Sequence, residues 1–169
     1  MTVPKEIEPY FLLLGWFVHS WSQVERNIDV YVAVVYHRCD GRTLIAEEYP
    51  RTALSRKLRY LRQAAETLPR LRPHAGELTA IVDAADEAST VRHNIFHGNL
   101  QSLSPDMIVL NKIDLDPKDG SLVSREINIA ADVFVAHADN VTSLASAAFM
   151  LSAKLLDDFG EDLIRETVG

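Results

Sequence analysis

Apolar residues recur at intervals of three and four in the first part of the chain, which is the spacing of one face of an α-helix. The resulting stripe consists of Leu14, Phe17, Trp21, Val24, Ile28, Tyr31 and Val35. This pattern predicts an amphipathic helix over residues 7–38, which the turn-forming pair Asp40-Gly41 would end. Because Phe17 and Trp21 belong to the stripe, we expect both to pack in the core.

Three further segments show the same periodicity. They predict helices over residues 52–68, 76–97 and 131–159. Pro69 and Pro73 would break the chain after the second helix, because proline cannot continue one, and Gly98 is well placed to end the third. The first and last helices are long and strongly striped, so we expect them to form the centre of the fold.

The period changes between the third and fourth predicted helices. Two apolar runs, at residues 107–110 and 122–129, flank the turn-forming sequence Asp116-Pro117-Lys118-Asp119-Gly120. This arrangement predicts a β-hairpin over residues 106–129. The expected fold is mostly α: an antiparallel four-helix bundle with a β-hairpin inserted before the last long helix, in one domain over residues 1–169.

Composition narrows the class of protein. The chain has a single cysteine, Cys39, so it cannot form an internal disulfide. Glu6 and Glu8 occupy positions where a secretory signal would be positively charged, and the apolar stretch 10–18 is about half of what spans a bilayer. We therefore expect a cytoplasmic protein without a membrane span. The net charge of -7 disfavours general affinity for nucleic acid.

The charge is unevenly distributed along the chain. Between Arg51 and Arg72 there are seven basic residues and one acidic residue, Glu66. The second predicted helix carries four of these basic residues: Arg56, Lys57, Arg59 and Arg62. They form a candidate basic patch for phosphate or for an acidic partner, and a solvated helix face is the alternative interpretation.

Arg92 occupies a stripe position of the third predicted helix. The stripe positions before it are Leu78, Ile81, Ala85 and Ala88. Because a buried arginine without a partner is costly, Arg92 should face a carboxylate, an anion or a subunit interface. Glu25, at the edge of the first stripe, is a candidate partner, and one interpretation is an Arg92–Glu25 ion pair that orients the two helices.

His97 follows Arg92 by five residues, immediately before Gly98. In a regular helix this separation corresponds to about 140° of rotation, so the two side chains would share a face only if the helix end bends. A guanidinium and an imidazole together suit RNA cleavage by transesterification without a metal. The histidine can move a proton at the ribose 2′-hydroxyl or the leaving oxygen, and the arginine can hold the phosphate. A capping or surface role for His97 is the alternative.

The sequence Arg92-His93-Asn94-Ile95-Phe96-His97-Gly98 resembles the signature of the HEPN superfamily (higher eukaryotes and prokaryotes nucleotide-binding domains). That signature is an arginine, four to six residues and a histidine, with Asn, Asp or His commonly following the arginine. The resemblance implies a metal-independent endoribonuclease without a cofactor, often a toxin or phage-defence effector that can have an antitoxin partner. It also implies that Arg92 and His97 are catalytic, that Glu25, His93 and Asn94 support them, and that two copies join their motifs in a homodimer.

Two alternatives follow from the same residues. Some proteins of this kind are non-catalytic, so the chain can instead be a dimeric HEPN-like module that binds nucleotide, RNA or protein. The spacing of His93 and His97 also suits two metal ligands on one helix face, along which Asp86 and Thr90 lie. Further ligands would come from His19, His37 and His137. The sequence Asn111-Lys112-Ile113-Asp114 matches a guanine-specificity motif, but no phosphate-binding glycine loop precedes it.

Overall fold

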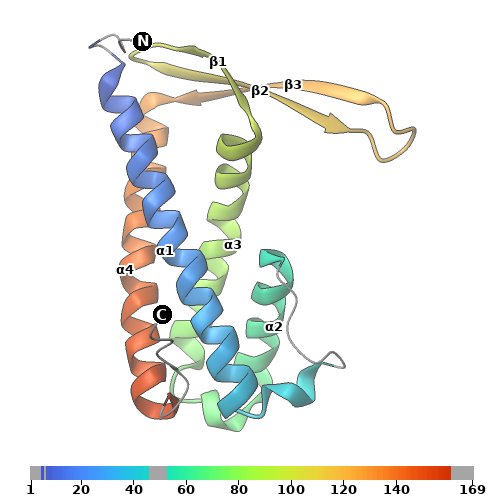
Figure 1. Cartoon of the computed structure of the whole chain (residues 1–169), viewed down its shortest axis with the longest axis vertical. Helices are drawn as coiled ribbons and strands as arrows, with labels where there is room; N and C mark the ends of the chain where they lie inside the picture. The colour runs from blue at the N-terminus through green and yellow to red at the C-terminus, as the bar shows by residue number, and fades with distance from the viewer. Residues whose placement is uncertain (1–4, 6, 46–52, 161–169) are drawn as a thin grey trace, which may run out of the picture.

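The computed structural model describes residues 5, 7–45 and 53–160. Over these residues the chain is mostly helical and contains one three-stranded antiparallel sheet (Figure 1). The helices are α1 (Glu8–Arg38), α2 (Leu54–Thr67), α3 (Ala75–His97) and α4 (Ala131–Phe159), with short 3-10 helices at Gly41–Leu44 and Pro69–Leu71. These bounds lie close to the ranges expected from periodicity, although the expected start of the second helix at residue 52 lies outside the described residues.

The helix directions differ from the fully antiparallel arrangement that we expected. α1 and α4 form the most extensive helix–helix contact, and they run parallel to each other (Figure 1). Trp16 Nε1 donates a hydrogen bond to Thr142 Oγ1 near one end of the pair, and Ser152 Oγ donates one to Asn27 Oδ1 farther along both helices. α3 runs in the opposite direction (Figure 1). α2 runs in the same direction as α1 (Figure 1), so the helices do not alternate in direction as they would with short connections throughout.

Two clusters of buried apolar side chains hold the helices together. The larger cluster joins all four helices, and the smaller one lies near the sheet. Phe17 and Trp21 are both buried in the smaller cluster, which confirms that they pack in the core. The ring of Phe17 contacts that of Phe134 on α4, with centroids 6.0 Å apart. None of the helices within the described ranges is long and apolar enough to cross a membrane.

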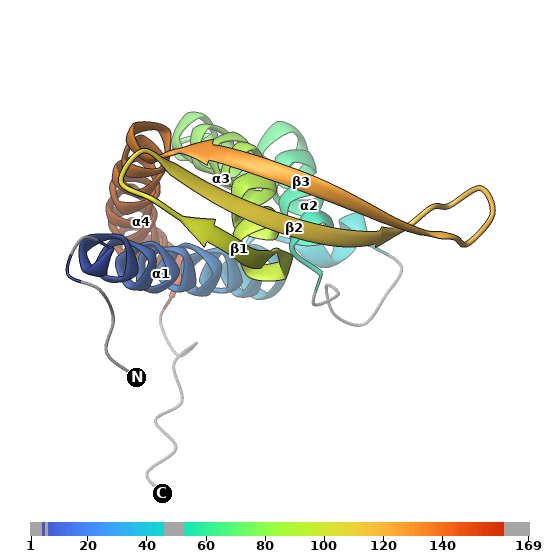
Figure 2. The same ribbon diagram turned by 90° about the horizontal axis from the view of Figure 1, so that it is seen from above.

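The sheet has the order β1-β2-β3 and lies across one end of the helices (Figure 2). The expected hairpin is confirmed: β2 (Met107–Leu115) pairs with β3 (Leu122–Ala130) in one regular antiparallel register. β1 (Asn99–Leu103) was not expected from the sequence. Its pairing with β2 shifts between Leu100 and Ser102, and this irregularity interrupts the alternation by which a strand is recognised.

Gly98 connects α3 directly to the sheet. Its N–H bonds to the carbonyl oxygen of Asn94 at 2.9 Å, and its backbone is extended, with φ -85° and ψ 138°. A Cβ at this position would lie 2.6 Å from that oxygen and 3.0 Å from the Cβ of Leu110 on β2. The glycine therefore ends the helix as expected, but the requirement for it is its close approach to the Asn94 carbonyl and to Leu110 of β2 rather than a left-handed backbone. The last turn of α3 is held against the sheet as a result.

Candidate functional site

Arg92 on α3 lies beside Glu25 on α1. The distance between Arg92 Nη2 and Glu25 Oε1 is 3.4 Å, which confirms the ion pair considered from the sequence. Both side chains are half-buried, at 28% and 37% exposure. The guanidinium also lies over the ring of Phe96, one helical turn later, with Cζ 4.7 Å from the ring centroid. Arg92 is thus held from two sides by a carboxylate and an aromatic face.

These contacts do not use all the donors of Arg92. A guanidinium has five N–H donors, and a strong charge-assisted hydrogen bond to a carboxylate is about 2.7–2.9 Å long, shorter than the contact with Glu25. Arg92 Nε is buried and has no hydrogen-bond partner among the described residues. The side chain is nevertheless 28% exposed, so its charge and its remaining Nη donors are not fully engaged by Glu25.

His93 and His97 form a pair of imidazoles on the same face of α3. Their ring centroids are 4.6 Å apart, and both side chains are exposed. α3 stays helical through His97, so the end of the helix does not bend to bring His97 beside Arg92. Arg92 and His97 therefore remain separated by about 140° around the axis of one helix.

His93 lies in a positive environment. Its pKa is lowered from the ordinary value first by partial desolvation of the imidazole and then by the charges of Lys112, His97 and Arg92, and Asp114 partly opposes this shift. Lys112 and Asp114 come from β2, and their side chains form an ion pair at 3.0 Å. The lowered pKa favours the neutral imidazole near neutral pH, the form that can accept a proton.

We expect opposite shifts in the pKa of His93 from two substitutions on β2. Lys112→Gln removes a positive charge and frees Asp114, so the pKa should rise; Asp114→Asn removes the opposing negative charge, so it should fall further. Titration of the His93 ring protons by NMR would measure both shifts. Shifts of equal sign in the two variants would contradict the placement of β2 beside α3.

The basic patch expected on α2 is divided in the structure. Lys57 forms an ion pair with a carboxylate of α1, and Arg62 bridges two carboxylates of α3 at 2.8 Å each. Arg56 and Arg59 are exposed to solvent. The carboxylate partners are Asp29, Asp83 and Asp86. Two of the four cations are therefore engaged in holding α2 against its neighbours.

The histidines considered as additional metal ligands lie apart from the pair on α3. The His19 ring contacts the Trp16 ring, and His37 Nδ1 lies 3.2 Å from a guanidinium nitrogen of Arg42. His137 lies on α4 and lines a groove between α3 and α4. The described part of the chain contains no group of three or more His, Cys, Asp or Glu side chains placed to hold a metal ion.

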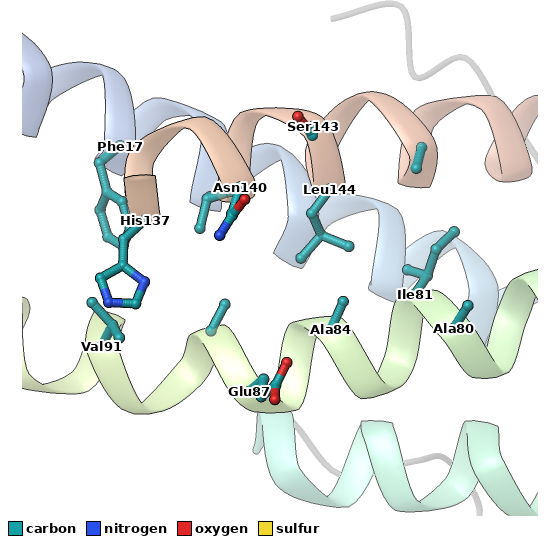
Figure 3. A pocket seen from close by; sticks show the side chains of 13 residues that line it. Phe17, Ala80, Ile81, Ala84, Glu87, Val91, His137, Asn140, Ser143 and Leu144 are labelled. Carbon is teal, nitrogen blue, oxygen red and sulfur yellow. The ribbon is translucent and has the colours of Figure 1, made fainter. Parts of the chain in front are cut away.

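The groove between α3 and α4 has a volume of about 640 Å³ (Figure 3). Its floor is mostly apolar, and small side chains such as Ala84 on α3 leave the space open (Figure 3). Polar groups lie along it: the imidazole of His137, the amide of Asn140 and the carboxylate of Glu87. This groove is a second candidate binding surface, distinct from the end of α3.

The end of α3 is the chemically richest surface of the described chain. Arg92 and the His93–His97 pair were anticipated from the sequence, as was the contact with Glu25, whereas Lys112 and Asp114 were not. Asn94 is half-buried beside them, and its carbonyl oxygen accepts the N–H of Gly98. Comparison of the chain with models of known families, with curated proteins and with solved structures finds no match.

Proposed function

We propose that this protein is a metal-independent endoribonuclease of HEPN type, acting as a toxin or phage-defence effector. The observation that carries the proposal is the incomplete pairing of Arg92. Arg92 Nη2 lies 3.4 Å from Glu25 Oε1, and Arg92 Nε has no hydrogen-bond partner among the described residues. Two imidazoles lie at the same end of α3. The mostly helical chain, with strands before the last helix, also supports the proposal.

In the proposed reaction the 2′-oxygen of a ribose attacks the adjacent phosphorus. A neutral imidazole accepts the 2′-hydroxyl proton, and a protonated imidazole donates a proton to the departing 5′-oxygen. The products are a 2′,3′-cyclic phosphate and a 5′-hydroxyl. Arg92 would hold the phosphate and offset the negative charge that develops on it, while Glu25 fixes the guanidinium. His97 is the proposed proton carrier, supported by His93 and Asn94.

The proposed site is shared between two copies of the chain. Because Arg92 and His97 point to different sides of one regular helix, His97 of one copy would act beside Arg92 of the other. An isologous dimer would then contain two such sites related by its two-fold axis. An antitoxin protein that covers these sites is part of the same proposal.

The test is incubation of the purified protein with mixed RNA in the presence of a chelator. We expect fragments with 2′,3′-cyclic phosphate and 5′-hydroxyl ends, identified by mass spectrometry. Cleavage that appears only when a divalent cation is added would contradict the metal-independent reaction. Fragments with 5′-phosphate ends would contradict attack by the 2′-oxygen.

The alternative is a non-catalytic, HEPN-like dimeric module that binds nucleotide, RNA or protein. Two observations favour it: the chain carries a net charge of -7, and the groove between α3 and α4 offers a largely apolar surface away from Arg92. Such a module would bind its ligand without producing fragments in the same experiment. Loss of binding on Ala84→Trp, which fills the groove, would then identify the surface involved.

A further inference from the structure

The β2–β3 hairpin extends past the helices as an arm. β1 pairs with β2 only as far as Asn111, opposite Asn99, and beyond this point the two remaining strands project away from the helices (Figures 1 and 2). We call residues 112–125 the hairpin arm. Because side chains alternate between the faces of a strand, Lys112 and Asp114 share the face of β2 that carries the buried Ile108 and Leu110. This inner face is the one turned toward the helices.

Two cations lie directly opposite each other on the inner face of the arm. The register of the hairpin pairs Lys112 with Arg125. Like charges in directly opposite positions destabilise a sheet. Asp114 compensates Lys112 through their 3.0 Å ion pair, whereas Arg125 lies exposed on the neighbouring strand. A pair of cations in this position fits a binding site for an anion.

The arm also lies close to the end of α3 that carries the motif. Lys112 is only 13% exposed, and its charge contributes to the lowered pKa of His93. Lys112, Arg125 and Arg92 therefore gather positive charge at one end of a chain whose net charge is -7. Repeated cations around a group that acts on a phosphodiester match the evenly spaced charges of a nucleic-acid backbone.

We propose that the inner face of the hairpin arm binds the RNA backbone beside the cleavage site, with Arg125 contacting a phosphate that flanks the scissile bond and Lys112 adding positive charge beside it. This inference rests on the proposed ribonuclease function and adds the residues that position its substrate. Arg125 is the better residue to test, because it is exposed and its substitution removes no contact from the core. Lys118 lies exposed in the turn of the same hairpin and provides a control of equal charge.

The experiment measures binding of a fluorescent single-stranded RNA by anisotropy, in a His97→Ala background that prevents cleavage. We expect Arg125→Glu to weaken binding by about tenfold or more, and Arg125→Gln to lower the slope of log affinity against log salt by about 0.7, the loss of one phosphate contact. Lys118→Glu, which makes the same charge change outside the inner face, should leave affinity nearly unchanged.

The possible outcomes separate this inference from the proposed catalysis. Cleavage by the wild type together with unchanged RNA affinity in Arg125→Glu would overturn the inference and leave the ribonuclease intact. RNA binding that depends on Arg125, without cleavage by the wild type, would support the arm and overturn the catalysis. Equal loss of RNA affinity in Arg125→Glu and Lys118→Glu would show a general charge effect and overturn the proposed role of the arm. Equally tight, Arg125-dependent binding of poly-glutamate would overturn it in favour of an acidic protein partner.

Discussion

Arg92→Ala and His97→Ala are each expected to lower the rate of RNA cleavage by about 10²–10⁴-fold, the range measured for loss of a general acid or base or of a charge-stabilising donor. The arginine variant loses the charge that offsets the developing negative phosphate. The histidine variant loses the proposed proton carrier. The measurement is the single-turnover cleavage rate of a labelled RNA in the presence of a chelator, with wild-type protein in parallel.

Two controls distinguish lost chemistry from lost structure. The Arg92–Glu25 pair is about one-third exposed, so removing it should cost no more than about 1 kcal/mol of unfolding free energy, measured by urea denaturation. Arg92→Lys keeps the charge but loses the planar, multi-donor guanidinium, so it should recover only a small part of the activity. Full activity in Arg92→Lys would reduce the role of Arg92 to a simple point charge, and full activity in Arg92→Ala would contradict the proposed site.

Mixing the two inactive variants tests whether the site is shared between copies. After equal amounts are allowed to exchange subunits, about half of the dimers should contain one copy of each variant. In a shared site, one of the two sites of each mixed dimer combines an intact Arg92 with an intact His97, so about a quarter of wild-type activity should return. A site contained within one copy would regain no activity, because each copy lacks one of the two residues.

The helices and the hairpin were predictable because their signals are local. The periodic stripe that includes Phe17 and Trp21 specifies α1, and Asp119-Gly120 specifies the turn between β2 and β3. β1 carries no such signal, because its leucines at positions 100 and 103 are brought to one face by an irregular register. The parallel packing of α1 and α4 was also not predictable, because hydrophobic periodicity identifies a helix but does not give its direction in the fold.

Part of the candidate site was predictable from the sequence, and part was not. An arginine in an apolar stripe must have a partner, and Glu25, at the edge of the first stripe, was the candidate predicted for Arg92. The charges of Lys112 and Asp114 beside His93 could not be predicted from the sequence, because they depend on how the sheet packs on the end of α3. The pairing within the basic patch could not be predicted, because the sequence shows the cations but not that Lys57 and Arg62 lie beside carboxylates.

Trp21→Ala is expected to lower the free energy of unfolding by about 3–5 kcal/mol, the usual cost of truncating a buried aromatic side chain. Trp21 is 1% exposed and packs between the helices and the sheet. Trp16, on the same helix, is 54% exposed and donates a hydrogen bond to Thr142 Oγ1 at 2.9 Å. Trp16→Ala should therefore cost only about 1 kcal/mol. Urea denaturation followed by circular dichroism would measure both.

The stabilities of the two tryptophan variants also test the candidate site, because Trp21 lies one turn before Glu25 on α1. The indole Nε1 of Trp21 is buried without a hydrogen-bond partner among the described residues, so Trp21→Phe loses volume but no hydrogen bond. It should be less damaging than Trp21→Ala and should keep α1 in place beside α3. RNA cleavage should then survive in Trp21→Phe at a temperature where that variant is folded. Equal losses of stability in Trp16→Ala and Trp21→Ala would contradict the packing of α1, and with it the position of Glu25 beside Arg92.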